Sequence, residues 1–335
     1  MTLRFSPLFS GSSGNAVYVS GCDMQLLIDC GMSCARVAGE LRAVGVSPED
    51  IGGILVTHEH IDHIRGVGVF ARKYRCPVYA TEETWAAMEE KLGAIPPENR
   101  RTVRPGEDFF LGQLNVTPFP TPHDAACSVG YVLSTPDGAR FGLATDIGCV
   151  RSGWLDAVRG CAAVLLESNY DPGMLQAGRY PYDLKRRIQS RKGHLSNDDA
   201  AEAALALVHA GARQLVLGHL SKENNFPELA LQCTMSALER DGAAGCRCAW
   251  PVGTAIPGYS PSAPKCWNKI RRTWRNPWEN IVFCVRSGRW FPGPWPCTPP
   301  PREPPPLRTL LFAVSSSRDF RWPRGRPFLW PRGGW

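Results

Sequence analysis

The sequence of 335 residues lacks three features that would assign it to a common class. It has no run of 18 or more apolar residues, which argues against a helix that spans a membrane. Its first residues lack the apolar stretch of a secretory signal, so we expect a cytoplasmic protein. It contains 13 Cys but no Cys-x-x-Cys pair, which argues against a structural zinc site and, in the cytoplasm, against disulfides.

The net charge of +7 is unevenly distributed along the chain. Residues 242–335 carry a balance of +12, whereas residues 1–241 carry −5. The same tail holds 9 of the 11 Trp and 17 of the 30 Pro, and in it only 281–285 and 310–314 are strand-like. We therefore predict one domain at 1–241 and a Pro/Trp/Arg-rich tail at 242–335. We favour a poorly ordered or frame-shifted tail over a third interpretation, a nucleic-acid-binding extension.

Residues 1–241 show the patterns of an α/β (α+β) protein. Strand-like patterns dominate the first half, and strands alternate with amphipathic helical patterns in the second half. This order favours two packed sheets with helices outside them. The expected strands are 3–9, 15–20, 25–29, 53–57, 77–80, 114–119, 128–134, 140–145, 162–166 and 213–217. The expected helices are 33–44, 64–74, 82–92, 150–158, 181–190, 196–210 and 226–240.

Histidine is scarce, with 7 residues in the chain, yet 3 of them fall within residues 57–63. This run reads Thr-His-Glu-His-Ile-Asp-His and follows a short apolar, strand-like segment. Imidazole and carboxylate groups are ligands of zinc and of neighbouring first-row metals. His58 and His60 are two residues apart, so both would point to one face of an extended strand, with Asp62 and His63 in a following loop. The alternative is that these histidines lie on the protein surface and bind no metal.

The motif resembles the His-x-His-x-Asp-His signature of the metallo-β-lactamase fold superfamily. The resemblance implies a four-layer αββα sandwich, here followed by an irregular C-terminal tail. It also implies two divalent metal ions, for which the ligand types allow zinc, manganese or iron. Three further candidates stand near strand ends in the expected order, although each alone is compatible with an ordinary loop residue. The implied ligands of one ion are His58, His60, His123 and Asp146, and those of the other are Asp62, His63, Asp146 and His219.

Two more residues gain a role from the same resemblance. In the phosphodiesterase branches of the superfamily, a histidine at the start of a late helix contacts the scissile phosphate, and His194 stands at such a position. Glu167 follows the apolar run 163–166 and fits the carboxylate that supports this histidine. The alternative is a helix-entry histidine and a strand-end surface acid. We expect Glu167, His194 and Asp62 to be catalytic, with Asp62 orienting the attacking water.

Three segments narrow the resemblance to the YycJ/WalJ group, which comprises bacterial cytosolic proteins associated with 5′-to-3′ DNA exonuclease activity. These segments are 10–15, 193–197 and 219–225. The resemblance covers about residues 1–240. It implies a short closing strand after the last helix, and we find no convincing counterpart in the sequence.

A basic run precedes His194 and predicts contacts with backbone phosphates, although such a run is more often a solvated helix face. Its members are Lys185, Arg186, Arg187, Arg191 and Lys192. The expected function is a dinuclear-metal DNA exonuclease acting on single-stranded or frayed ends, with RNA as a further substrate. One rival is another hydrolase of this fold, acting on a small cyclic phosphodiester, RNA or a thioester. The other is an inactive nucleic-acid-binding protein. The oligomeric state stays open.

Overall fold

The computed structural model describes residues 2–150, 153–243, 246–249 and 283–286. All of them belong to one compact unit, Met1–Arg289. The expected strand at 310–314 lies outside the described residues. No helix in the described ranges is long and apolar enough to cross a membrane.

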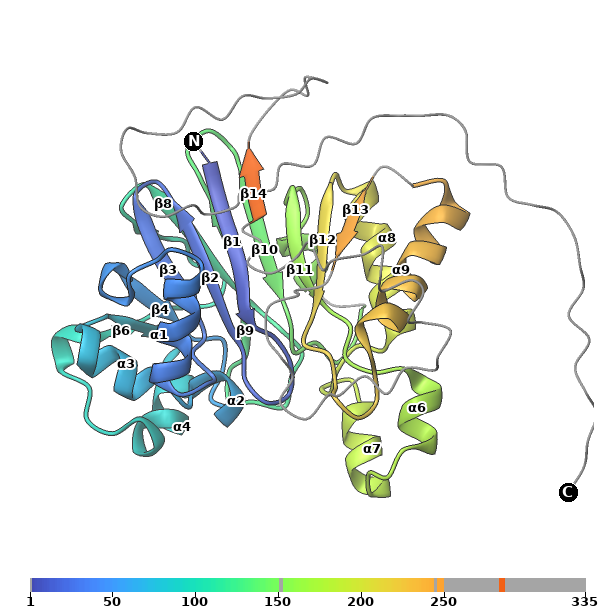
Figure 1. Ribbon diagram of the computed structural model, residues 1–335, viewed down its shortest axis with the longest axis horizontal. Helices are drawn as coiled ribbons and strands as arrows, with labels where there is room; N and C mark the ends of the chain where they lie inside the picture. The colour runs from blue at the N-terminus through green and yellow to red at the C-terminus, as the bar shows by residue number, and fades with distance from the viewer. Residues whose placement is uncertain (1, 151–152, 244–245, 250–282, 287–335) are drawn as a thin grey trace, which may run out of the picture. The chain divides into compact units, whose positions relative to one another are not determined.

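Two mixed sheets pack face to face and carry helices on their outer faces (Figure 1). This arrangement confirms the four-layer αββα sandwich. In spatial order, the first sheet contains β14 (Phe283–Arg286), β1 (Thr2–Phe9), β2 (Ala16–Gly21), β3 (Met24–Ile28), β4 (Gly53–Leu55), β5 (Val78–Ala80) and β6 (Arg100–Thr102). The second contains β13 (Arg247–Ala249), β12 (Gln214–Gly218), β11 (Ala163–Glu167), β10 (Arg140–Ala144), β9 (Val129–Ser134), β8 (Leu114–Pro120) and β7 (Phe109–Leu111).

The helices fall into two sets, one over each sheet, with α6 and α7 at one end of the second sheet (Figure 1). The first sheet carries α1 (Cys34–Ala43), α2 (Ile61–Ile64), α3 (Val67–Tyr74) and α4 (Glu82–Leu92). The second sheet is followed by α5 (Trp154–Ala157), α6 (Pro172–Ala177), α7 (Tyr182–Ile188), α8 (Asn197–His209) and α9 (Pro227–Asp241). Two 3-10 turns occupy Pro48–Asp50 and Pro97–Asn99.

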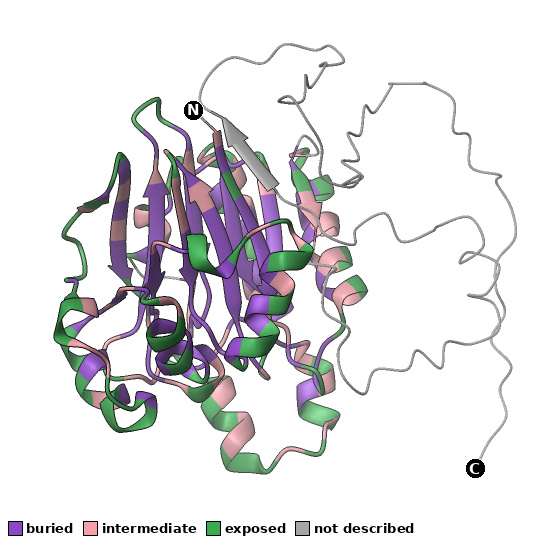
Figure 2. Ribbon diagram, turned by 60° about the vertical axis from the view of Figure 1, so that its left-hand side comes forward, coloured by how far each residue is buried: buried purple, intermediate pink, exposed green. Residues whose placement is uncertain are grey.

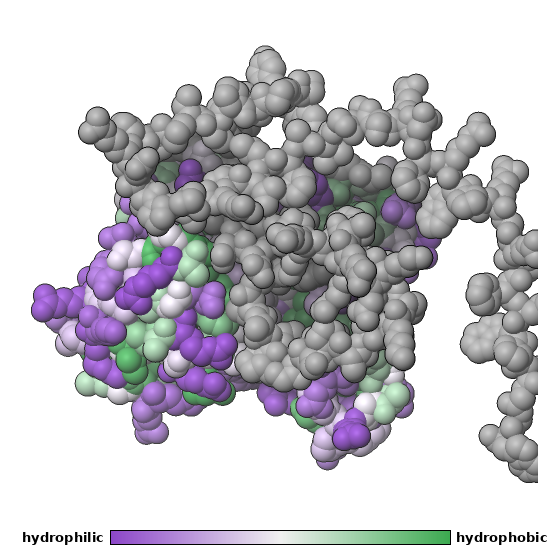
Figure 3. Space-filling view, in the orientation of Figure 1, coloured by the Kyte–Doolittle hydropathy of each residue, from purple (hydrophilic) through white to green (hydrophobic). Residues whose placement is uncertain are grey.

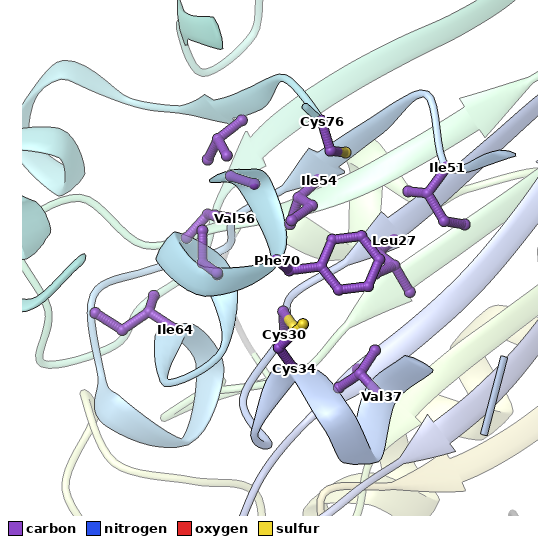
Figure 4. Packing of buried hydrophobic residues seen from close by; sticks show 14 of the residues in the cluster. Leu27, Cys30, Cys34, Val37, Ile51, Ile54, Val56, Ile64, Phe70 and Cys76 are labelled. Atoms are coloured by element: carbon purple, nitrogen blue, oxygen red, sulfur yellow. The ribbon is translucent and has the colours of Figure 1, made fainter. Parts of the chain in front are cut away.

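Buried residues run along the strands of both sheets, and exposed residues lie mainly on the helices and loops (Figure 2). Most of the buried residues are apolar. Between the two sheets, the rings of Phe5 and Phe141 stack with centroids 4.2 Å apart. Between the first sheet and its helices, Phe70 of α3 points into a cluster with Leu27 and Cys30 (Figure 4). Burial of this apolar surface is the main force that holds the layers together.

The predicted absence of a closing strand is wrong. After α9 the chain forms β13, which pairs in parallel with β12 so that Arg247 lies opposite Gln214. The strand is only three residues long, too short to show a period of two in the sequence. The strand expected at 281–285 is present as β14, which pairs antiparallel with β1. Both strands follow residue 242. The division into a domain at 1–241 and a tail at 242–335 stays a prediction.

The secondary structure of residues 58–63 differs from the expected strand followed by a loop. Strand β4 ends at Leu55, so His58 and His60 lie in the loop beyond it. The next helix begins at Ile61, so Asp62 and His63 lie on α2. The expected helix 64–74 is broken at Gly66, where a Cβ atom would lie 2.2 Å from the carbonyl oxygen of Met32. Tight packing of this turn against the end of β3 overrides helix propensity.

Gly31 provides a test of this packing. A Cβ atom there would lie 1.6 Å from the carbonyl oxygen of Asp62, and backbone cannot move as a flexible side chain does. We expect Gly31→Ala to lower the free energy of unfolding by roughly 1–3 kcal/mol, measured by urea denaturation. Gly39→Ala is the control, because nothing lies within 4 Å of a Cβ on that helical glycine. Equal stability of the two variants would contradict the packing argument.

Candidate metal centre

The seven residues named as metal ligands converge at one end of the two sheets. Their loops follow the ends of strands from both sheets, so the fold brings together positions more than 150 residues apart. The loop after β4 and helix α2 supply four of them, and the loops after β8, β10 and β12 supply one each. In chain order they are His58, His60, Asp62, His63, His123, Asp146 and His219.

One half of the cluster consists of three histidines. The Nε2 atom of His58 lies 3.0 Å from Nδ1 of His60, which lies 3.3 Å from Nε2 of His123. The ligand-type atoms of these three residues all lie within 4.8 Å of one another. The loop after β4 therefore brings His58 and His60 together without the extended strand that their spacing suggested.

The other half contains Asp62, His63 and His219, and Asp146 lies between the two halves. The Oδ2 atom of Asp62 is 3.6 Å from Nε2 of His63 and 3.9 Å from Nε2 of His219. The carboxylate of Asp146 approaches Nε2 of His63 at 3.5 Å, that of His219 at 3.5 Å and that of His123 at 3.7 Å. Asp146 is thus the one carboxylate that contacts both halves among the residues the structure describes.

Two atoms of the cluster are buried without a hydrogen-bond partner in the described structure. They are Oδ2 of Asp146 and Nε2 of His219. Buried polar atoms are normally paired, and a carboxylate oxygen beside an imidazole nitrogen is the donor set of a first-row cation. Both residues also have left-handed backbones, with φ of 58° and 54°, a strained conformation that is often found at functional sites. The residues present therefore fit divalent metal ions.

Burial and neighbouring charges set the protonation of the cluster in the protein without ions. Burial lowers the pKa of His58 well below its usual value, so this imidazole is neutral. Burial alone would raise the pKa of Asp146, but the imidazoles of His219 and His63 hold it well below its usual range. Burial opposes a charge on His63, yet Asp146 and Asp29 raise its pKa to about 9. An ionised carboxylate thus already lies among the imidazoles.

Hydrogen bonds behind the cluster orient its imidazoles. Oδ2 of Asp29 lies 2.8 Å from Nδ1 of His63, and Thr57 donates to the same carboxylate from its backbone nitrogen and its hydroxyl, each at 2.8 Å. Nδ1 of His123 lies 3.0 Å from the carbonyl oxygen of Gly193. A proton held on Nδ1 leaves Nε2 free to bind a metal. The sequence reasoning missed Asp29, although it follows β3 just as Asp146 follows β10.

Glu167 and His194 lie side by side at the edge of the cluster. Oε1 of Glu167 is 2.8 Å from Nδ1 of His194 and also 2.8 Å from Nδ1 of His219. Its Oε2 accepts from the backbone nitrogens of Ile147, at 2.8 Å, and Leu195, at 3.2 Å. Burial opposes the charge on Glu167, but the imidazoles of His194 and His219 lower its pKa to about 2. One fully buried carboxylate therefore orients both imidazoles, and the contact with His219 was not expected.

A pocket beside the cluster is lined by Asp62, Asp146 and His194 and by one member of the basic run, Arg187. Arg187 forms an ion pair with Asp124. Lys185 instead donates to the carbonyl oxygen of Gln176 at 2.8 Å. The other three basic residues are exposed and do not line this pocket: Arg186, Arg191 and Lys192. The structure thus brings only part of the run to the site.

Asp29 should influence metal affinity without touching the metal. We expect Asp29→Asn to weaken metal binding about 10–100-fold, because the His63 imidazole loses the carboxylate that orients it. Equilibrium dialysis of the metal-free protein against Mn²⁺ or Zn²⁺ measures the change. Asp50→Asn is the control, since Asp50 is exposed in a 3-10 turn. Unchanged affinity in the Asp29 variant would show that this hydrogen bond does not support the site.

Comparisons with known proteins agree with this geometry. Residues 24–220 match the family model described as a beta-lactamase superfamily domain. The chain is 41% identical over 242 residues to exodeoxyribonuclease YycJ of Bacillus anthracis, covering 72% of this chain and 91% of that protein. It is also 41% identical over 237 residues to exodeoxyribonuclease WalJ of Streptococcus pneumoniae, covering 70% of this chain and 88% of that protein.

Solved structures show the same fold at low sequence identity. The metallo-beta-lactamase fold protein YhfI of Bacillus subtilis superposes with a TM-score of 0.59 at 15% identity, covering 75% of this chain and 96% of that one. Zn²⁺-bound PqqB of Methylobacterium extorquens gives a TM-score of 0.56 at 18% identity, covering 74% and 97%. The chain therefore belongs to the metallo-β-lactamase fold superfamily and, within it, to the family of YycJ and WalJ.

Proposed function

We propose that this protein is a two-metal nuclease that degrades DNA from single-stranded or frayed ends in the 5′-to-3′ direction. The observation that carries the proposal is His194, whose imidazole lies on the pocket wall beside the metal cluster with Nδ1 held by Glu167. An imidazole oriented by a buried carboxylate suits a phosphate or an oxygen leaving group. A thioester or lactam substrate has no phosphate for this pair to contact.

We assign the proposed metal ligands from the two halves of the cluster. His58, His60 and His123 with Asp146 would hold one ion, and Asp62, His63 and His219 with Asp146 would hold the other. Ions held there would supply a hydroxide near neutral pH and neutralise phosphate charge. The proposal leaves zinc, manganese and iron as candidates, because imidazole and carboxylate bind all three.

The protein's own groups would complete the reaction. Asp62, with a side chain 22% exposed, faces the pocket and would orient the attacking water. His194, with a side chain 21% exposed, would contact the phosphate and give a proton from Nε2 to the leaving oxygen. Glu167 keeps the Nδ1 proton of His194 in place. Arg187, held by Asp124 at the same pocket, would bind a backbone phosphate.

The names of the relatives support the substrate. YycJ and WalJ are both named exodeoxyribonucleases, and this chain spans most of the length of each. DNA is therefore the proposed substrate, with RNA as the competitor to include in each assay. We infer a cytoplasmic location, which the sequence predicts and which fits a nuclease of this family.

Activity assays test the catalytic assignments. We expect the wild type to shorten 5′-phosphorylated single-stranded DNA with Mn²⁺, and His194→Ala to lower the rate about 10²–10⁴-fold through loss of proton transfer. Asp62→Ala should be at least as defective, because it also removes a metal ligand. His209→Ala is the control, since His209 is 62% exposed on α8 and bonds Asp241. Equal degradation of DNA by all four proteins, or no degradation by the wild type, would refute the proposed nuclease activity.

Metal removal gives a second test with a physical readout. The carboxylates and imidazoles of the cluster lie close together, so bound ions should stabilise the folded state by mass action, about 2.7 kcal/mol at 100 times Kd. We expect a chelator to abolish DNA degradation and to lower the melting temperature, and Mn²⁺ or Zn²⁺ to restore both. The measurements are differential scanning calorimetry and DNA degradation on the same samples. Full activity after verified metal removal would contradict the proposal.

A further inference from the structure

Helix α7 presents two different faces at the edge of the pocket. Its inner face, formed by Leu184, Arg187 and Ile188, lines the pocket beside the metal cluster. Its outer face carries Tyr182 and Arg186, which are four residues apart and therefore neighbours on the helix surface. The helix lies at the same end of the sheets as α2, which carries part of the metal motif (Figure 1). A strand of nucleic acid leaving the pocket over α7 would meet this outer face.

Tyr182 is exposed to an unusual degree for its size. Its exposed fraction is 73%, the highest among the large hydrophobic residues that the structure describes, ahead of Phe110 at 66%. The guanidinium of Arg186 lies 5.8 Å from the centre of the Tyr182 ring. In Figure 3 the projection at the lower edge, formed by α6 and α7, shows hydrophilic and apolar residues side by side. An open aromatic face beside a positive charge is the arrangement that stacks a base and binds the adjacent phosphate.

The position of Tyr182 separates it from an ordinary exposed aromatic. Tyr180, two residues earlier, lines the pocket itself, and Arg187 at the end of the helix lines it too. Lys185, Arg186 and Arg187 follow each other on α7, so this short helix carries three positive charges against one acidic residue, Asp183. Phe110 lies on β7 and is not part of the pocket wall. A single exposed apolar residue is normal on a protein surface and needs no explanation. An exposed ring among basic residues beside the pocket, in contrast, is complementary to the bases and phosphates of a nucleic acid.

We propose that Tyr182 stacks on an unpaired base of the DNA substrate and, with Arg186, forms a docking surface for single-stranded DNA at the pocket edge. The inference rests on the proposed nuclease function and adds the origin of its preference for single-stranded ends. An unpaired base can offer a face to the ring, whereas a base inside a duplex is covered on both faces by its neighbours. Tyr182 and Arg186 thus set substrate choice, whereas His194 and Asp62 act on the phosphate.

The test measures binding of 5′-phosphorylated single-stranded DNA by fluorescence anisotropy at constant salt, in an Asp62→Ala background that prevents cleavage. We expect Tyr182→Ala to weaken binding roughly 5- to 150-fold, the range for one lost base–aromatic stack. Tyr182→Phe keeps the ring and should stay within about twofold of the background. Phe110→Ala is the matched control, because Phe110 is another largely exposed aromatic residue but lies away from the pocket, and this variant should have no effect.

A second oligonucleotide distinguishes stacking from a general loss of affinity. Its first four nucleotides are abasic, so it retains the phosphates but offers no base to the ring. We expect Tyr182→Ala to have no effect on this oligonucleotide. Equal affinities with the normal oligonucleotide, or an equal loss with both, would overturn the stacking proposal.

Turnover of the normal oligonucleotide by proteins with Asp62 intact separates this inference from the nuclease proposal. If DNA binding depends on Tyr182 but the DNA is not degraded, the nuclease proposal alone is refuted. Turnover that Tyr182→Ala leaves unchanged at subsaturating DNA would refute the docking surface alone.

Discussion

The position of Asp146 is the constraint on which the site depends. It stands two residues beyond β10, in a left-handed backbone conformation that directs its carboxylate toward imidazoles from both halves of the cluster. That conformation costs free energy in a residue with a Cβ atom, and the paired strands on both sides hold it in place. Without this carboxylate, the two halves of the cluster would share no ligand.

The double-sheet fold makes this constraint possible. Each sheet contributes loops to the same end, and parallel pairing of β10, β11 and β12 aligns the ends of three strands that carry Asp146, Glu167 and His219. Glu167 then connects the metal cluster to His194 through one carboxylate. The same end carries α7, so the residues proposed for catalysis, phosphate binding and base stacking occupy adjacent surfaces. The packed layers stabilise the fold, so the loops at this end can carry the polar residues of the site.

Much of this arrangement was predictable from the sequence, because its strongest signals are local. The run from His58 to His63 indicates metal binding in six residues. Asp146 and His219 each follow an apolar, strand-like run, which places them at one end of a sheet. The three-residue strands β6 and β13 have no such signal, and each is defined by its pairing with one neighbouring strand. The start of α2 at Ile61 was also missed, because packing against Gly31 and the end of β3 decides it.

Residues that act through others were hardest to foresee. Asp29 contacts His63 across 34 positions of sequence, and the contact of Glu167 with His219 spans 52. Neither pairing leaves a pattern in the chain. The most direct test of the account is anomalous diffraction from crystals grown with Mn²⁺. We expect two anomalous peaks roughly 3.5–4 Å apart, with Asp146 contacting both. A single peak, or two peaks without Asp146 between them, would contradict it.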